Sequence, residues 1–178
     1  IALFNAEVDS NGNLTNTSRW DLAGEAVAIA EPYGVRVHLC VTNFSSPSIE
    51  GLLSSSSARQ KLITSLEDWV DATGADGVNI DFEGLPYSVK AEMVQFTKDL
   101  ETAVGEVVLA TPAVDWDGSW DFDQLNLYAD MFIMGYDYHW GGSSEAGPVD
   151  PLYGGGPWGS RAIDWTIEDY LTWGANPD

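Results

Sequence analysis

The sequence has few cysteines, histidines and basic residues, and each shortage excludes a class of protein. Cys40 is the only cysteine among 178 residues, so the chain forms no intramolecular disulfide and no zinc site built from several cysteines. The two histidines, His38 and His139, are too scattered in the sequence to indicate a zinc site. We therefore expect no metal and no cofactor in the functional site.

Positive charge is scarce as well. Seven Lys and Arg stand against 28 Asp and Glu, which leaves a net charge of −21. A field of this sign repels nucleic-acid phosphates and anionic membrane surfaces, and no apolar run approaches the roughly 18–20 residues of a membrane span. We expect neither a nucleic-acid partner nor membrane insertion, and the acidic balance favours an extracellular or cell-wall location.

What the sequence does contain is typical of one folded domain spanning residues 1–178. Its residues are 44% hydrophobic and 12% aromatic, enough apolar surface to offset the entropy lost on folding. The chain begins inside an expected strand at Ile1 and stops just after an expected helix. We therefore expect it to be part of a longer protein.

Apolar runs of strand length alternate with amphipathic stretches, which is typical of βα units around a parallel sheet. Pro32 and Gly34 end the first helix, and the serine run 54–57 offers an N-cap for the next. The expected strands are residues 1–8, 35–44, 77–84, 106–114 and 130–140, and the expected helices are residues 20–34, 58–74, 88–105, a short segment within 122–128, and 160–173. The pattern predicts an α/β fold with five parallel strands.

The segment 76–83, with the sequence DGVNIDFE, carries the strongest chemical signal. Side chains two apart on a strand share a face, so Asn79, Asp81 and Glu83 point together, and the apolar residues between them face the helices. Two carboxyl groups this close on a half-buried strand do not easily both ionise. We expect Glu83 to keep its proton and to act as a general acid. The alternative is that the carboxylates only solvate the end of the strand.

This segment resembles the DGxDxDxE signature of glycoside hydrolase family 18, the chitinases and related N-acetylglucosaminidases. Met134-Gly135-Tyr136-Asp137 is similar to that family's Met-x-Tyr-Asp strand, and the segment IALFNAEVDSNGNLT at the start of the chain is similar to its second strand and turn. The resemblance covers nearly the whole chain and implies an incomplete (β/α)₈ TIM barrel that holds about strands 2 to 6.

Two departures from the family pattern concern the substrate. Asn79 stands where the commonest signature has Asp, and Thr42-Asn43-Phe44 replaces Ser-x-Gly-Gly. These features resemble the branch with spore-wall and LysM-associated glucosaminidases and chitinase-domain proteins. The chemistry need not be lost, because an Asn79 amide is still able to hydrogen-bond Asp81.

The resemblance implies retaining, substrate-assisted hydrolysis of a β-1,4-linked GlcNAc polysaccharide, either chitin or peptidoglycan. Glu83 would protonate the glycosidic oxygen, Asp81 would orient the acetamide N–H, and Tyr136 would donate to the acetamido oxygen. Asp137 would bind a sugar hydroxyl or organise the loop, and Asn79, Met134 and Trp140 would also belong to the substrate-binding site. The alternative is that Tyr136 is an ordinary aromatic residue of the hydrophobic core.

Tryptophans in loops that follow strands are candidates for stacking on sugar rings, although they also cover the edges of protein cores. The four candidates are Trp116, Trp120, Trp140 and Trp158, and Trp140 is the strongest of them. The acidic loop 115–123 does not match a calcium-loop pattern, and we interpret it as solvated.

Two other classes compete with an enzyme. A non-catalytic, lectin-like GlcNAc-binding module would lack a catalytic Glu, whereas Glu83 and Asp81 are both present. A structural or interaction domain with an acidic surface would bind no carbohydrate. By the resemblance, the first strand and the last two strands are absent, so we expect open sheet edges that self-associate, and little activity in the isolated chain.

Overall fold

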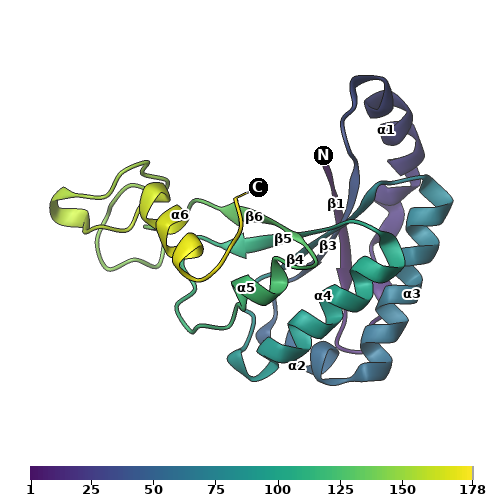
Figure 1. Cartoon of the computed structure of the whole chain (residues 1–178), viewed down its shortest axis with the longest axis horizontal. Coiled ribbons are helices and arrows are strands. Elements are labelled where there is room, and N and C mark those ends of the chain that lie inside the picture. Colours follow the sequence, from purple (N-terminus) through teal and green to yellow (C-terminus); the bar gives the residue numbers. More distant parts are fainter. Residues whose placement is uncertain (178) are drawn as a thin grey trace.

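The computed structural model describes residues 1–177 and contains one mostly parallel sheet of six strands (Figure 1). The strand order is β2-β1-β3-β4-β5-β6, in which only β2 runs antiparallel to its neighbour. The strands are β1 Ala2–Val8, β2 Leu14–Thr15, β3 His38–Asn43, β4 Gly77–Phe82, β5 Val107–Pro112 and β6 Asp130–Met134. All five expected strands are present, and the two-residue β2 is an addition.

Six α-helices accompany the sheet in the described residues. They are α1 Ala23–Ala30, α2 Ser46–Ser54, α3 Ser56–Thr73, α4 Lys90–Val104, α5 Phe122–Leu125 and α6 Ile163–Thr172, and the 3₁₀ turns are η1 Thr17–Leu22, η2 Glu31–Tyr33, η3 Tyr87–Val89 and η4 Gly156–Trp158. The Ser55 hydroxyl accepts from the Ala58 N–H at 3.3 Å, which confirms the predicted N-cap of α3. None of the helices in this part of the chain is long and apolar enough to cross a bilayer.

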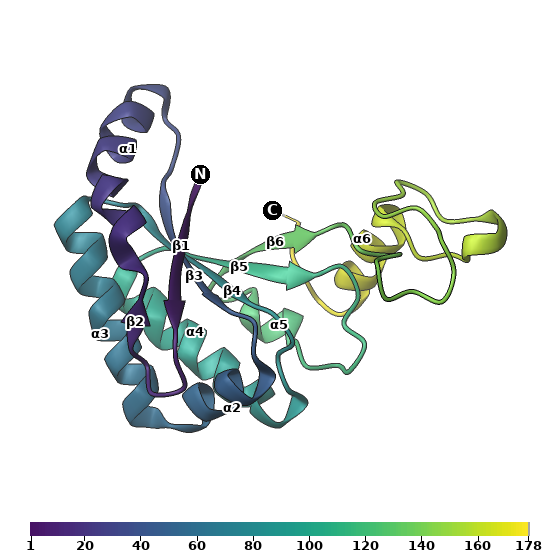
Figure 2. The ribbon, with the colours of Figure 1, turned by 180° about the vertical axis from the view of Figure 1, so that it is seen from behind.

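Helices α3 and α4 lie side by side against one face of the sheet, as both views show (Figures 1 and 2). Val78, Ile80 and Phe82 of β4 point into this layer and are fully buried, as their alternation predicts. The Phe82 ring stacks on Phe96 of α4 at 6.1 Å between centroids. The core between sheet and helices thus fixes which face of β4 is left for polar residues.

The opposite, concave face is polar at its centre. Strands β3 and β4 pair in register, so that Cys40 lies beside Asn79 and Thr42 lies beside Asp81. Cys40 is 1% exposed, and burial together with the nearby charge of Asp81 raises the pKa of its thiol to about 12. The prediction that Cys40 is a buried residue is confirmed.

The two edges of the sheet differ in how they are covered. Only Glu7 and Val8 of β1 pair with β2, and no described strand pairs with the outer side of β6. Phe4 of β1 is 48% exposed and Phe132 of β6 is 52% exposed. Unpaired strand edges that carry exposed aromatic residues are templates for association.

We therefore predict that the chain of residues 1–178 self-associates through β6. The change Phe132→Lys should shift it toward monomer, because a charge on the edge opposes strand pairing. Sedimentation velocity at micromolar concentration measures the effect. Tyr33→Lys is the control, since Tyr33 is also exposed but lies in η2, away from the edge. A wild-type chain that sediments as a monomer would contradict the prediction.

Candidate active site

Strand β4 positions the acidic residues of the site. Its first residue, Gly77, packs so tightly that a Cβ there would lie 2.1 Å from the Glu106 carbonyl oxygen, which explains the glycine in the motif. Asn79 and Asp81 lie on the concave face, and Glu83 follows the last strand residue. The Glu83 N–H donates to the Asn43 carbonyl at 3.0 Å, which continues the pairing to β3 beyond the strand.

Asp81 is partly buried, and its Oδ1 atom has no hydrogen-bond partner among the described residues. Burial, and secondarily the charge of Glu83, raises the pKa of Asp81 to about 6. The motif alone favours Glu83 as the holder of a retained proton. The structure favours Asp81, because Asp81 is the more buried carboxyl and Glu83 is exposed.

Strand β6 brings Met134 to the site but ends there. The expected strand over 130–140 is wrong beyond this point, because the Gly135 and Tyr136 N–H groups donate to the Ile133 and Met134 carbonyls at 2.9 and 2.7 Å. These local turns replace pairing with a neighbouring strand. Asp137 then adopts a φ of 60°, in the left-handed region that few residues other than glycine occupy. Tyr136 and Asp137 therefore lie on the loop that follows β6.

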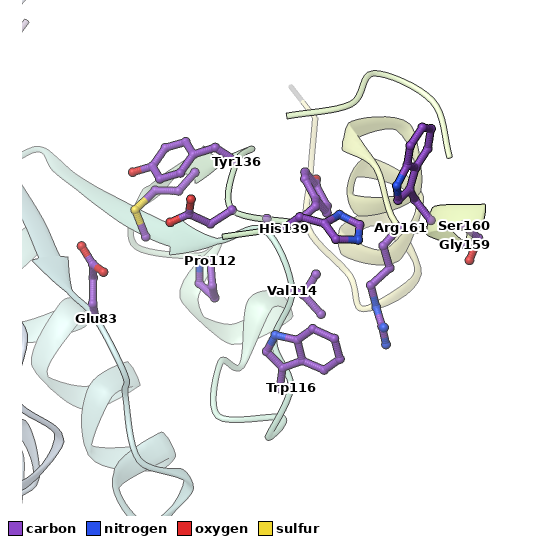
Figure 3. A pocket seen from close by; sticks show the side chains of 14 residues that line it. Glu83, Pro112, Val114, Trp116, Tyr136, His139, Gly159, Ser160 and Arg161 are labelled. Atoms are coloured by element: carbon purple, nitrogen blue, oxygen red, sulfur yellow. The ribbon is translucent and has the colours of Figure 1, made fainter. Parts of the chain in front are cut away.

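Tyr136 lies in the electrostatic field of the acidic residues. Partial burial raises the pKa of its hydroxyl, and the charges of Glu83, Asp81 and Asp137 raise it further. Figure 3 shows the hydroxyl end of Tyr136 on the same side of the pocket as Glu83. The structure thus brings Glu83, Asp81, Tyr136 and Asp137 together, and the Tyr136 hydroxyl stays protonated as a hydrogen-bond donor at neutral pH.

A cavity of about 550 Å³ opens beside these residues (Figure 3). It is bounded by the last residues of β5 and β6, by residues that follow β4, β5 and β6, and by the segment before α6. Its lining residues are Glu83, Pro112, Ala113, Val114, Trp116, Met134, Tyr136, Asp137, Tyr138, His139, Trp158, Gly159, Ser160 and Arg161. The carboxyl ends of parallel strands are where barrel and open α/β enzymes build their active sites.

Helix α6 does not line the cavity itself, but its side chains are hydrogen-bonded to residues that do. The Tyr138 and Thr166 hydroxyls lie 2.5 Å apart, and Thr166 donates to the Ala113 carbonyl at 2.8 Å. Tyr170 donates to the Pro112 carbonyl at 2.6 Å. The loop after β6 and the end of β5 are therefore tied to one helix, which holds the cavity walls at a fixed separation.

Four predicted site residues, Asn79, Asp81, Trp120 and Trp140, lie outside the cavity lining. Asn79 is buried and donates to the Val108 carbonyl at 3.3 Å, and no hydrogen bond joins it to Asp81 among the described residues. Trp140 is 64% exposed and does not line the cavity, and Trp120 belongs to the core. Trp116 and Trp158 do line the cavity. The acidic loop is structural in part, because Asp115 accepts from the Ser119 and Trp120 N–H groups.

Arg161 is the one Lys or Arg residue in the described cavity lining, and no motif in the sequence points to it. A signal for it exists in the sequence, because Arg161 is the only Lys or Arg after Lys98. In the described residues we find no cluster of three or more acidic, His or Cys side chains arranged to hold a metal ion.

Comparison with known proteins shows the family of the chain. The family model described as "Glycosyl hydrolases family 18" matches residues 6–178, and the chain belongs to this family. The protein named "Putative sporulation-specific glycosylase YdhD", from Bacillus subtilis (strain 168), is 30% identical over an alignment of 169 residues, and the alignment covers 85% of this chain and 39% of YdhD. Exochitinase 1 of Streptomyces olivaceoviridis is 26% identical over 102 residues, which are 57% of this chain and 17% of that protein.

Solved structures confirm the predicted fold class. The YdhD crystal structure has a TM-score of 0.79 at 25% identity and covers 97% of this chain and 58% of its own. Catalytic domain 2 of the Ostrinia furnacalis Group II chitinase has a TM-score of 0.87 at 21% identity, covering 99% of this chain and 53% of its own. A variant of that domain was solved in complex with (NAG)5. The sheet is therefore an incomplete (β/α)₈ barrel, and the chain spans 39% of the length of YdhD.

The raised pKa of Asp81 predicts a pH-dependent cost in stability. Below about pH 4 the carboxyl is protonated in the folded and the unfolded chain. Between the ordinary value of 3.8 and about 6 the unfolded chain loses the proton first, so the free energy of unfolding falls as pH rises. The change Asp81→Asn removes this fall in the free energy of unfolding, because asparagine does not titrate.

We expect the difference in free energy of unfolding between Asp81→Asn and wild type to grow by on the order of 2 kcal/mol from pH 4 to pH 7. Urea titrations at both pH values measure it. Asp68→Asn, at an exposed position of α3, is the matched control. The same difference at both pH values would show that Asp81 titrates normally.

Proposed function

We propose that the site cleaves β-1,4 bonds in GlcNAc-containing polysaccharide by a retaining, substrate-assisted mechanism. The observation that carries the proposal is the placement of Glu83, Asp81 and Tyr136 at the carboxyl ends of two strands beside a cavity of about 550 Å³. Membership in glycosyl hydrolases family 18 supports glycoside hydrolysis of chitin-like substrates in general. The (NAG)5 complex of the Ostrinia domain supports a GlcNAc polymer as the substrate class.

The first step in this mechanism is proton delivery by Glu83, which receives the proton that Asp81 retains in the free site when Asp81 turns toward the substrate's acetamide N–H. Its side chain is exposed to the cavity, so it reaches a glycosidic oxygen that enters from solvent. As the C1–O bond breaks, the carbonyl oxygen of the substrate's own 2-acetamido group forms a bond to C1. In the second step the oxygen of a water molecule forms a bond to C1 as the bond from C1 to the acetamido oxygen breaks, and Glu83, now a carboxylate, takes the proton that the water loses.

Asp81 and Tyr136 act on the acetamido group. The Oδ1 atom of Asp81 has no hydrogen-bond partner among the described residues, but it is buried and Asp81 does not line the cavity. Asp81 therefore turns toward the cavity to accept a hydrogen bond from the acetamide N–H, which disperses the positive charge that develops there. Because the pKa of the Tyr136 hydroxyl is raised, it remains a donor for the acetamido oxygen. These two contacts hold the nucleophile near C1, and positioning of this kind supplies a large part of the rate enhancement in intramolecular reactions.

The first test replaces Glu83 by Gln in the full-length protein. Glutamine keeps the shape of the side chain but delivers no proton, so turnover of a chromogenic chitobioside should fall about 10²–10⁴-fold while oligosaccharide binding survives. Glu67→Gln, at an exposed position of α3, is the control. Turnover near the wild-type rate would rule out Glu83 as the acid. Binding without turnover in the wild-type protein would instead identify a lectin-like module.

A second test separates substrate assistance from a nucleophile supplied by the protein. A substrate in which hydroxyl replaces the 2-acetamido group should not react, because the attacking oxygen is missing, and an oxazoline-like inhibitor should compete with the natural substrate. Initial rates on the matched pair of substrates measure the difference. Efficient cleavage of the hydroxyl substrate would exclude the mechanism.

A further inference from the structure

Arg161 is a positive charge in a strongly acidic protein, and it lines the cavity that begins at Glu83. Among the described residues lining this cavity it is the only Lys or Arg. The two acidic side chains in the lining, Glu83 and Asp137, add to a net charge of −21 for the chain. An anionic ligand is repelled by this field unless a local positive charge offsets it.

Two tryptophans hold the guanidinium of Arg161 in place. Its Cζ lies 4.0 Å from the centroid of the Trp116 ring and 5.5 Å from that of Trp165. Trp116 belongs to the loop after β5, and Trp165 belongs to α6. These cation–π contacts involve the ring faces and orient the guanidinium between two separate elements.

The N–H donors of this guanidinium remain available. In the part of the chain that the structure describes, the ion pairs are those of Arg36 and His38 with Glu106, and no hydrogen bond uses an Arg161 N–H. A guanidinium presents its donors in a planar fork that matches the two oxygens of a carboxylate. The guanidinium of Arg161 is therefore held in a fixed orientation, and none of its N–H groups pairs with a carboxylate of the described residues.

The position of Arg161 relative to Glu83 determines which part of a bound glycan Arg161 would contact. Figure 3 shows Glu83 at one side of the pocket and Arg161 at the opposite side, with Tyr136 and His139 between them. A glycan whose scissile bond lies at Glu83 would extend along the cavity toward Arg161. The group that meets Arg161 thus belongs to a sugar beyond the scissile bond.

We propose that Arg161 binds a carboxylate carried by the glycan, so that the preferred substrate is a 2-acetamido-sugar polymer with acidic substituents, such as the lactyl ether of N-acetylmuramic acid. This inference rests on the proposed function for the presence of a glycan in the cavity. It adds a specificity-determining residue, because a neutral GlcNAc polymer has no negative group for the fork to bind.

The experiment measures binding of two chain-matched oligosaccharides to the full-length protein by calorimetry. One is a GlcNAc oligomer, and the other has N-acetylmuramic acid at alternate positions. We expect the acidic oligomer to bind about 10-fold more tightly, as for one charge-assisted hydrogen-bonded pair, and the preference to weaken with added salt. The methyl ester of the acidic oligomer should lose the preference.

Arg161→Gln should weaken binding of the acidic oligomer about 10-fold, whereas binding of the neutral oligomer falls less than about threefold. Arg161→Lys keeps the charge but loses the fork, so it should retain part of the preference. Lys98→Gln is the matched control, because Lys98 also lies over an aromatic ring, that of Tyr128 at 5.7 Å, but outside the cavity. Thermal unfolding of each variant verifies folding.

The outcomes distinguish this inference from the proposed function. Equal affinity of the wild-type protein for both oligomers, or a preference that persists in Arg161→Gln, overturns the role of Arg161 and leaves the hydrolase proposal standing. Failure of the wild-type protein to bind either oligomer overturns both proposals.

Discussion

The burial of one face of β4 against α3 and α4 is the constraint on which the site depends. Val78, Ile80 and Phe82 fill that interface completely, so the strand cannot rotate or slip without exposing them. The period of two then obliges Asp81 to lie on the concave face. Apolar packing on the helix side therefore determines the place of the acidic chemistry on the other side.

The two carboxyl groups of the site differ because one is buried more deeply than the other, not because their residue types differ. Asp81 and Glu83 have similar side chains, but Asp81 lies beside Thr42 within the sheet and Glu83 stands at its rim. The two carboxyls therefore differ in solvation, and the difference suits them to different tasks, one near the substrate's amide and one at the solvent-facing bond.

Much of this arrangement was predictable from the sequence, because alternation and turn residues are local signals. The strands, the N-cap at Ser55 and the shared face of Asp81 and Glu83 all follow from such signals. Helix α2 did not, since its Ser46-Pro47-Ser48 start looks like a loop although proline fits the first turn of a helix. The cavity role of Trp116 and the exposed position of Trp140 depend on loop paths, which no local pattern encodes.

Cys40 has a consequence for labelling this protein. The thiol lies under the acidic centre, almost fully buried, and its pKa of about 12 leaves almost no thiolate at neutral pH. Cys40 therefore reacts very slowly with maleimides while the chain is folded. A spectroscopic probe attached through a single cysteine introduced into the loop between β6 and α6 would report from that loop alone, with the wild-type background left intact.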